Sequence, residues 1–165
     1  MKRFLASGFG VGLVWQNIFG NKKGGGTLAP LIFTVLVYFL NLNVLALSIL
    51  FVSLLLIYFY SVEDHYADED PSWITLDEIV GMSLVSLASP SEMLPLIAGF
   101  LVFRASDILK QPKFVSQLEN YPGKLGVLYD DLGAGLLGLL SATICLLYTS
   151  PSPRDYAASR MPSSA

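Results

Sequence analysis

Long apolar stretches separated by short polar breaks run through most of the chain. No strict alternation of apolar and polar residues is sustained in them, which argues against β-strands, and their lengths suit helices. The nearly charge-free stretches are residues 27–40, 44–60, 79–90 together with 94–103, and 132–148. We therefore predict an all-α fold built from these segments.

The length of these stretches leaves two architectures open. A stretch of 13 to 17 residues rises about 20–26 Å as a helix, whereas a hydrocarbon core of about 30 Å usually requires about 20 residues. The helices cross a bilayer if their semi-polar ends extend them; otherwise they form an unusually apolar soluble bundle. We predict the first, a compact bundle of about four to six mostly membrane-embedded helices.

Composition favours the membrane-embedded alternative. The chain of 165 residues is 53% hydrophobic and only 14% charged, whereas about 25% of the residues in a soluble domain are charged. Its mean hydropathy is +0.59. The net charge of −3 provides no basic surface, so we expect no nucleic acid partner. The single cysteine, Cys145, excludes an internal disulfide.

Charged residues collect at one end of the bundle if neighbouring stretches pair as hairpins. The hairpins would join residues 28–40 to 44–60 and residues 79–90 to 94–109. Glu92 is then the only charge in the two distal turns. The remaining charges before residue 148 lie in the N-terminal segment and in residues 20–27, 61–78 and 104–131. Every charged segment therefore converges on one face.

The basic residues at this end predict its orientation. Lys and Arg near the ends of membrane helices favour the cytoplasmic side. The charged end contains Lys22, Lys23, Arg104, Lys110, Lys113 and Lys124. We therefore expect it to face the cytoplasm, where an active site at a membrane surface would be accessible.

Three acidic motifs lie beside the apolar stretches. They are Asp77-Glu78, the series Arg104, Asp107 and Lys110, and Asp130-Asp131. Each motif has a purely structural explanation: acidic residues at a helix start stabilise the macrodipole, and Arg104 with Asp107 can form an intrahelical ion pair. Ionisable groups at membrane depth are costly and usually functional, however. Three such motifs on one predicted face favour a site.

The residue types in these motifs suit a hard cation and a phosphate. Carboxylates without histidine or thiolate partners are typical of Mg²⁺ sites, where substrate phosphate completes the coordination shell. Arg104 and Lys110 can neutralise phosphate oxygens. The glycine-rich segment 20–27 offers amides and a hydroxyl at a helix start, although it is not a P-loop. The single histidine, His65, lies in an acidic loop, where we expect it to be solvated.

The motifs, in this order, resemble the phosphatidylglycerophosphatase A family of bacterial Mg²⁺-dependent lipid phosphatases. The resemblance runs from about residue 7 to residue 147. The matching elements are Gly26-Thr27; Asp77-Glu78 with Gly81-Met82; Phe103-Arg104 with Asp107 and Lys110; and Gly126 followed by Asp130-Asp131 with Ala134-Gly135. After Lys110 the chain departs from the family pattern, because it continues Gln111-Pro112-Lys113. This departure concerns substrate positioning, since the acidic positions are all retained.

The resemblance implies hydrolysis of phosphatidylglycerophosphate to phosphatidylglycerol and phosphate at the bacterial cytoplasmic membrane. We predict Asp107, Asp130 and Asp131 as catalytic residues, with water attack or an aspartyl-phosphate both open. Phosphate would be bound by Arg104, Lys110, Thr27 and Gly26. Mg²⁺ would be bound by Asp77, Glu78, Asp107 and Asp131. The oligomeric state stays open.

Two alternatives and a domain boundary complete the sequence predictions. The chain could be a non-enzymatic small helical membrane protein, such as a transport or assembly subunit, or a catalytically degenerate family member. A phosphatidyltransferase is disfavoured because the CDP-alcohol transferase motif is missing.

We predict one domain over residues 1–148 and a disordered tail of non-native appearance over 149–165, because the tail is rich in Ser, Pro and Ala.

Overall fold

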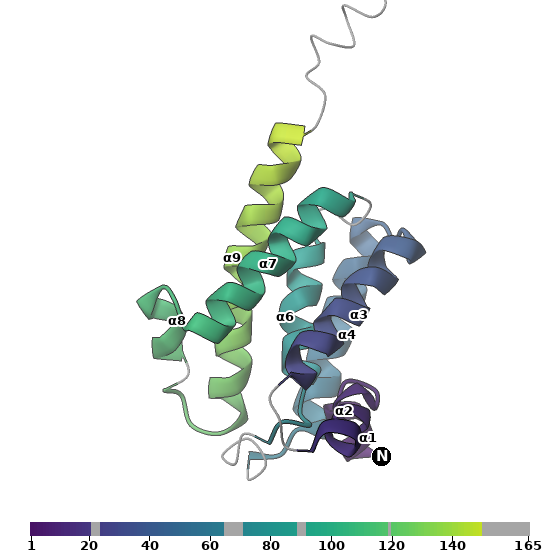
Figure 1. Ribbon diagram of the computed structural model, residues 1–165, viewed down its shortest axis with the longest axis vertical. Coiled ribbons are helices and arrows are strands. Elements are labelled where there is room, and N and C mark those ends of the chain that lie inside the picture. Colours follow the sequence, from purple (N-terminus) through teal and green to yellow (C-terminus); the bar gives the residue numbers. More distant parts are fainter. Residues whose placement is uncertain (21–23, 65–70, 89–91, 119, 150–165) are drawn as a thin grey trace, which may run out of the picture.

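Helices account for all the regular structure in the computed structural model, which describes residues 1–20, 24–64, 71–88, 92–118 and 120–149 (Figure 1). Within these ranges there are eight helices and no strand, so the all-α prediction is confirmed. They are α1 (Lys2–Ala6), α2 (Val11–Phe19), α3 (Gly25–Leu40), α4 (Val44–Ser61), α6 (Leu76–Ser86), α7 (Met93–Leu109), α8 (Lys113–Leu118) and α9 (Lys124–Thr149).

Two asparagines explain where the first hairpin turns. Asn41 ends α3 in the left-handed conformation, with φ of 47°, which Asn tolerates better than most residues. The Asn43 side chain then accepts a 2.8 Å hydrogen bond from the Ala46 amide and caps α4. The chain therefore turns between residues 28–40 and 44–60 as predicted, and α3 and α4 each pack against α6. Helices α6 and α7 form the second pair, and the connecting residues 89–91 lie outside the described part of the chain.

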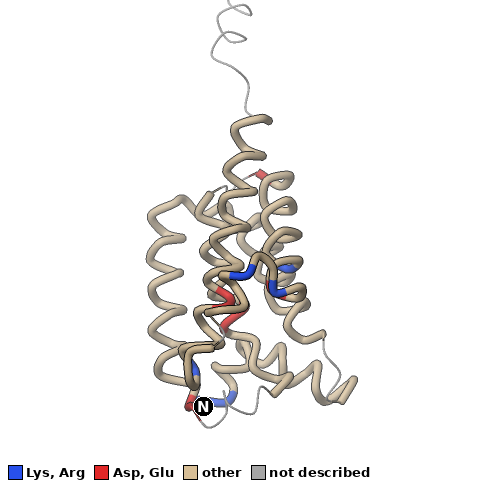
Figure 2. The backbone as a smooth tube through the Cα atoms, turned by 90° about the vertical axis from the view of Figure 1, so that its left-hand side faces the viewer, with Lys and Arg blue, Asp and Glu red and all other residues tan. Residues whose placement is uncertain are grey.

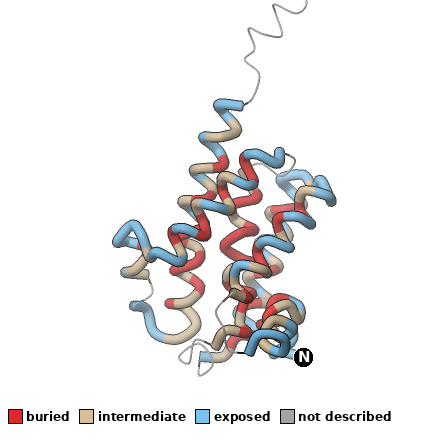
Figure 3. Tube along the Cα trace, in the orientation of Figure 1, coloured by how far each residue is buried: buried red, intermediate tan, exposed pale blue. Residues whose placement is uncertain are grey.

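Helix α6 is the centre of the bundle. Nine of its 11 residues are buried, and Figure 3 shows the buried positions concentrated on it and on the inward faces of its neighbours. Small residues allow α9 to cross it closely: a Cβ on Gly135 would lie 2.8 Å from the carbonyl oxygen of Gly81. The helix is therefore a core element, which explains why an 11-residue apolar helix need not span a bilayer.

Exposed apolar side chains form a belt around the outer helices. The outward stripe of α7 consists of Leu94, Ile97, Leu101 and Ile108, which are 43–64% exposed and repeat at helical spacing. Similar stripes run along α3 from Leu31, along α4 from Val44, and along α9 from Leu136. Among the described residues, α4 and α9 are long and apolar enough to cross a membrane, and α3 is a shorter apolar helix.

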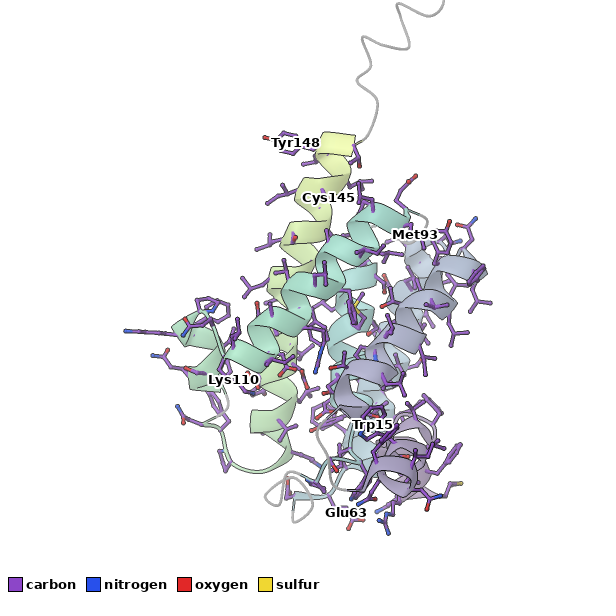
Figure 4. The ribbon with its side chains drawn as sticks, viewed as in Figure 1. Trp15, Glu63, Met93, Lys110, Cys145 and Tyr148 are labelled. Atoms are coloured by element: carbon purple, nitrogen blue, oxygen red, sulfur yellow. The ribbon has the colours of Figure 1, made fainter. Side chains whose placement is uncertain are left out.

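Charged residues lie toward one end of this belt, as the hairpin pairing predicts. Figure 2 shows the described charges mainly in the lower half of the molecule, with red also near the top. Glu92 immediately precedes Met93, the first residue of α7, and Figure 4 shows Met93 at the end of that helix opposite Lys110. The N-terminal helices close the charged end, because Lys2 bonds to Glu63 at 2.7 Å and Arg3 lies 5.0 Å from the ring of Trp73.

The last helix corrects one predicted boundary. The apolar stretch predicts a helix over residues 132–148, but α9 begins at Lys124 and ends at Thr149. Thr149, the first residue assigned to the tail, is therefore helical. Residues 150–165 lie outside the described part of the chain, so their predicted disorder stays a prediction.

Candidate active site

The guanidinium of Arg104 joins three helices at the centre of the candidate site. Arg104 lies on α7 and is 9% exposed. Its Nη1 contacts Asp107 Oδ2 at 2.6 Å on the same helix and Glu78 Oε1 at 3.3 Å on α6. Its Nη2 donates a 3.1 Å hydrogen bond to Thr27 Oγ1 on α3. Arg104 therefore contacts a side chain 77 residues away in the sequence as well as one on its own helix.

Lys110 extends the site to a fourth helix. It ends α7 in the left-handed conformation, with φ of 51°, and its ammonium group bonds to Asp130 on α9. The same Nζ lies 3.8 Å from Asp107 Oδ1, so Asp107 faces both cations. Figure 4 shows Lys110 at the end of α7 nearest α9.

Asp77 and Asp131 occupy the interior side of the site. They are only 5% and 4% exposed, and Asp131 interacts electrostatically with Asp77, Glu78 and Asp107. Close helix packing brings them together, because a Cβ on Gly81 would lie 2.8 Å from the Asp131 carbonyl oxygen. Negative charge from three helices is thereby concentrated in a space of low dielectric constant, where it requires compensation.

Part of that compensation is missing from the described residues. Glu78 Oε2, Asp130 Oδ1 and Asp131 Oδ1 are buried and have no hydrogen-bond partner among them. Burial raises the pKa of Glu78 well above its ordinary value; Asp77 adds to the increase and Arg104 opposes it. A buried carboxylate oxygen without a partner is unfavourable. The unpartnered oxygens therefore make this site suitable for binding an additional cation.

The donor set fits Mg²⁺, although the carboxylates are not arranged as a finished metal site. In the part of the chain that the structure describes, no group of three His, Cys, Asp or Glu side chains is close enough to hold a metal ion. Arg104 and Lys110 contact three of the carboxylates and hold them in ion pairs. The unpartnered oxygens are hard donors of the kind that Mg²⁺ prefers. Binding would therefore require these ion pairs to rearrange.

The structure brings all the sequence-predicted site residues into one region: Gly26, Thr27, Asp77, Glu78, Arg104, Asp107, Lys110, Asp130 and Asp131. Gly26 and Thr27 belong to the first turn of α3, the helix start at which the sequence places them. Asp130 and Asp131 lie nearly two turns inside α9, so helix-dipole stabilisation does not explain them. Gly26 faces the Glu78 carboxylate and not an open anion site. His65 lies outside the described residues.

Sequence reasoning missed Tyr58, which supports the site from α4. Its side chain is fully buried, and its hydroxyl donates a 2.7 Å hydrogen bond to the carbonyl oxygen of Lys124. Tyr58 lies inside a long apolar run, where a tyrosine gives no signal of a polar role.

Comparison with known proteins shows similarity over nearly the whole chain. A family profile described as "Phosphatidylglycerophosphatase A" matches residues 4–146. A protein of Bacteroides thetaiotaomicron described as "Putative phosphatidylinositol-3-phosphatase" is 33% identical over 144 residues, covering 82% of this chain and 87% of that protein. No solved structure gives a significant match.

Proposed function

The chain belongs to the phosphatidylglycerophosphatase A family, and from this we propose that it hydrolyses phosphatidylglycerophosphate to phosphatidylglycerol and inorganic phosphate. The family match and the similarity to the Bacteroides protein together support a lipid phosphatase. The observation that carries a lipid phosphomonoester as substrate is a largely buried group of five carboxylates and two cations, contributed by three helices, at the edge of an apolar belt. A lipid phosphomonoester requires both a charged site for its phosphate and an apolar surface beside its acyl chains.

The position of the site along the helices supports a lipid substrate. Thr27 lies one turn before Leu31, the first exposed apolar residue of α3, and is therefore just outside the belt. Helix α7 runs toward the charged end, so Arg104, one turn before Ile108, is just inside the belt. One turn rises about 5.4 Å, so the two groups lie on either side of the belt's edge. The acyl chains of a substrate would remain in the bilayer while its phosphate reaches the charged end. We further propose that this end faces the cytoplasm, because its Lys and Arg residues follow the positive-inside rule.

The proposed reaction assigns separate tasks to cations and carboxylates. Asp77, Glu78, Asp107 and Asp131 would hold Mg²⁺, which when bound would supply Lewis-acid chemistry for the phosphoryl group and for water. Arg104, Lys110 and the Thr27 hydroxyl bind and orient the phosphate, and Gly26 gives it access to the first turn of α3.

The proton balance requires one of the carboxylates. Water attacks phosphorus, the bond from phosphorus to the glycerol oxygen breaks, and a carboxylate takes the water proton. The carboxyl group that took this proton then delivers it to the leaving glycerol oxygen, which regenerates the carboxylate. Asp107, Asp130 and Asp131 are the candidates for this transfer, because they face the cations that would hold the phosphate.

Phosphatidylinositol 3-phosphate is a second candidate substrate because of the name given to the Bacteroides relative. Both lipids carry a phosphomonoester beside a bilayer, and they differ in whether glycerol or an inositol ring bears it. The same group of cations and carboxylates suits either, so the distinction depends on measurement.

One assay tests the function and the cofactor. Full-length protein purified in detergent is given each lipid, and phosphate release is measured with added Mg²⁺ and with EDTA. We expect release from phosphatidylglycerophosphate that requires the cation and is abolished by D131N. The matched control is E92Q, which neutralises an exposed carboxylate at the opposite end and should retain wild-type activity. Absence of release from either lipid would favour a non-enzymatic or degenerate protein, and full activity of D131N would remove Asp131 from the reaction.

A further inference from the structure

The carboxylate of Glu78 lies against the first turn of α3. A Cβ added to Gly26 would lie 1.7 Å from Glu78 Oε1 and 2.5 Å from Oε2. The carboxylate therefore fills the space that a side chain at position 26 would need. The N-terminal turn of a helix is favourable for an anion, and in this structure the carboxyl group of Glu78 occupies that position.

The other groups around this position are ligands that proteins use for phosphate. Arg104 Nη1 contacts Glu78 Oε1, and Arg104 Nη2 donates to Thr27 Oγ1. Arg104 is nine-tenths buried, and its Nε has no hydrogen-bond partner among the described residues. A buried guanidinium, a hydroxyl and a helix N-terminus form a binding site for a tetrahedral oxyanion.

Glu78 is held less firmly there than its neighbour Asp107 is. Its contact with Arg104 Nη1 is 3.3 Å, compared with 2.6 Å for Asp107. Its second oxygen, Oε2, has no partner in the described part of the chain. A phosphate carries more charge and more acceptor oxygens than a carboxylate, so it can also use Arg104 Nε and the Thr27 hydroxyl.

We propose that Glu78 occupies the phosphate-binding site of the resting protein and leaves it when a phosphomonoester or inorganic phosphate binds. The identity of the ligand rests on the proposed function; the displacement of Glu78 does not. Asp107 keeps Arg104 in place during the exchange because it holds the shorter ion pair. The displaced Glu78 carboxylate is then available to bind a cation beside the other carboxylates. Phosphate binding would thereby promote cation binding.

Binding of inorganic phosphate to the full-length protein in detergent and EDTA tests this displacement without catalysis. An internal group that fills a site nine-tenths of the time weakens the apparent affinity of the ligand about tenfold. We therefore expect E78Q to bind phosphate about tenfold more tightly than wild type by calorimetry, because glutamine lacks the charge that competes. R104Q should lose binding.

Two further variants separate displacement from general electrostatics and from misfolding. D77N removes the same charge from the adjacent position of α6 and should tighten binding by less than about threefold. E78D keeps the charge but shortens the side chain, which withdraws the carboxylate from Gly26, so it should bind phosphate more tightly than wild type. E78D also carries the test if E78Q does not fold.

The outcomes distinguish this inference from the proposed function. Unchanged or weaker phosphate binding by both Glu78 variants would overturn the inference, as would a gain in D77N equal to that in E78Q, even if the protein is an active phosphatase. Tighter binding by both Glu78 variants in a protein that releases no phosphate from lipids would support the displacement and refute the proposed function.

Discussion

The hydroxyl of Tyr58 donates a 2.7 Å hydrogen bond to the carbonyl oxygen of Lys124, joining the last turn of α4 to the first turn of α9. A second contact reinforces the junction, because Lys124 Nζ donates to the Phe59 carbonyl at 3.3 Å. Asp130 and Asp131 lie less than two turns further along α9. The junction therefore fixes the position of α9 along its axis, and with it the places where these two carboxylates face α6 and α7.

Removing the Tyr58 hydroxyl should lower both stability and activity. Y58F keeps the buried ring but loses one hydrogen bond, which is worth about 1 kcal/mol and should lower the melting temperature by about 2–4 °C. Phosphate release should fall because α9 is less firmly placed. Thermal unfolding in detergent and the lipid assay measure the two effects. The control is Y60F, whose ring is 56% exposed; equal behaviour of the two variants would contradict the positioning role.

Replacing Arg104 with lysine should reduce activity although the charge is kept. Arginine contacts two carboxylates and Thr27 at once from a planar fork, which an ammonium group cannot reproduce. We expect phosphate release to fall by about 100-fold, the usual effect of losing one well-placed donor to a reacting group.

The control for this variant is K113R, since Lys113 is exposed at the start of α8. It should retain wild-type activity. A rate for R104K within threefold of wild type would show that the guanidinium geometry is not needed.

The helical hairpins were predictable from the sequence, and the start of α9 was not. Apolar runs interrupted by asparagines mark α3 and α4 directly, because Asn is a strong turn and cap residue. Residues 124–131 mix lysine, tyrosine and two aspartates with apolar residues, so they read as a polar connection. They are helical because Leu128 is buried in the core and Lys124 is tied to α4.

That the predicted residues would lie together could be foreseen from the sequence, but the pairing of their charges could not. Motif spacing identifies the acidic and basic residues, since each motif depends on neighbouring positions in the chain. Which carboxylate meets which cation depends on how closely the helices cross. The contact of Gly81 with Gly135 sets that crossing for α6 and α9, and no local pattern specifies it.

The apolar belt predicts which positions face lipid and which face water. In a C145S background that removes the natural thiol, a cysteine at Leu101 should resist a membrane-impermeant maleimide, because this exposed position lies within the α7 stripe. A cysteine at Gln111, beyond the belt, should react only after the cytoplasmic side is opened. A cysteine at Glu92 should react in intact cells.

This labelling pattern depends on both the belt and the proposed orientation. Reaction at Gln111 in intact cells would reverse the orientation while leaving the belt valid. Ready reaction of the cysteine at Leu101 from either side would show that the stripe on α7 faces water.

The raised pKa of Glu78 predicts how stability responds to pH in the absence of divalent cations. Helix α6 is not one of the candidate membrane spans, and burial raises the Glu78 pKa well above 4.5 in the folded protein. The folded state then binds more protons than the unfolded state between these two pKa values. The contribution of Glu78 to the free energy of unfolding therefore falls as pH rises through that range. E78Q cannot ionise, so its melting temperature in EDTA should decline less steeply as pH rises above 4.5. E92Q, which alters an exposed carboxylate, should keep the wild-type slope; identical slopes for E78Q and wild type would show that Glu78 titrates equally in both states.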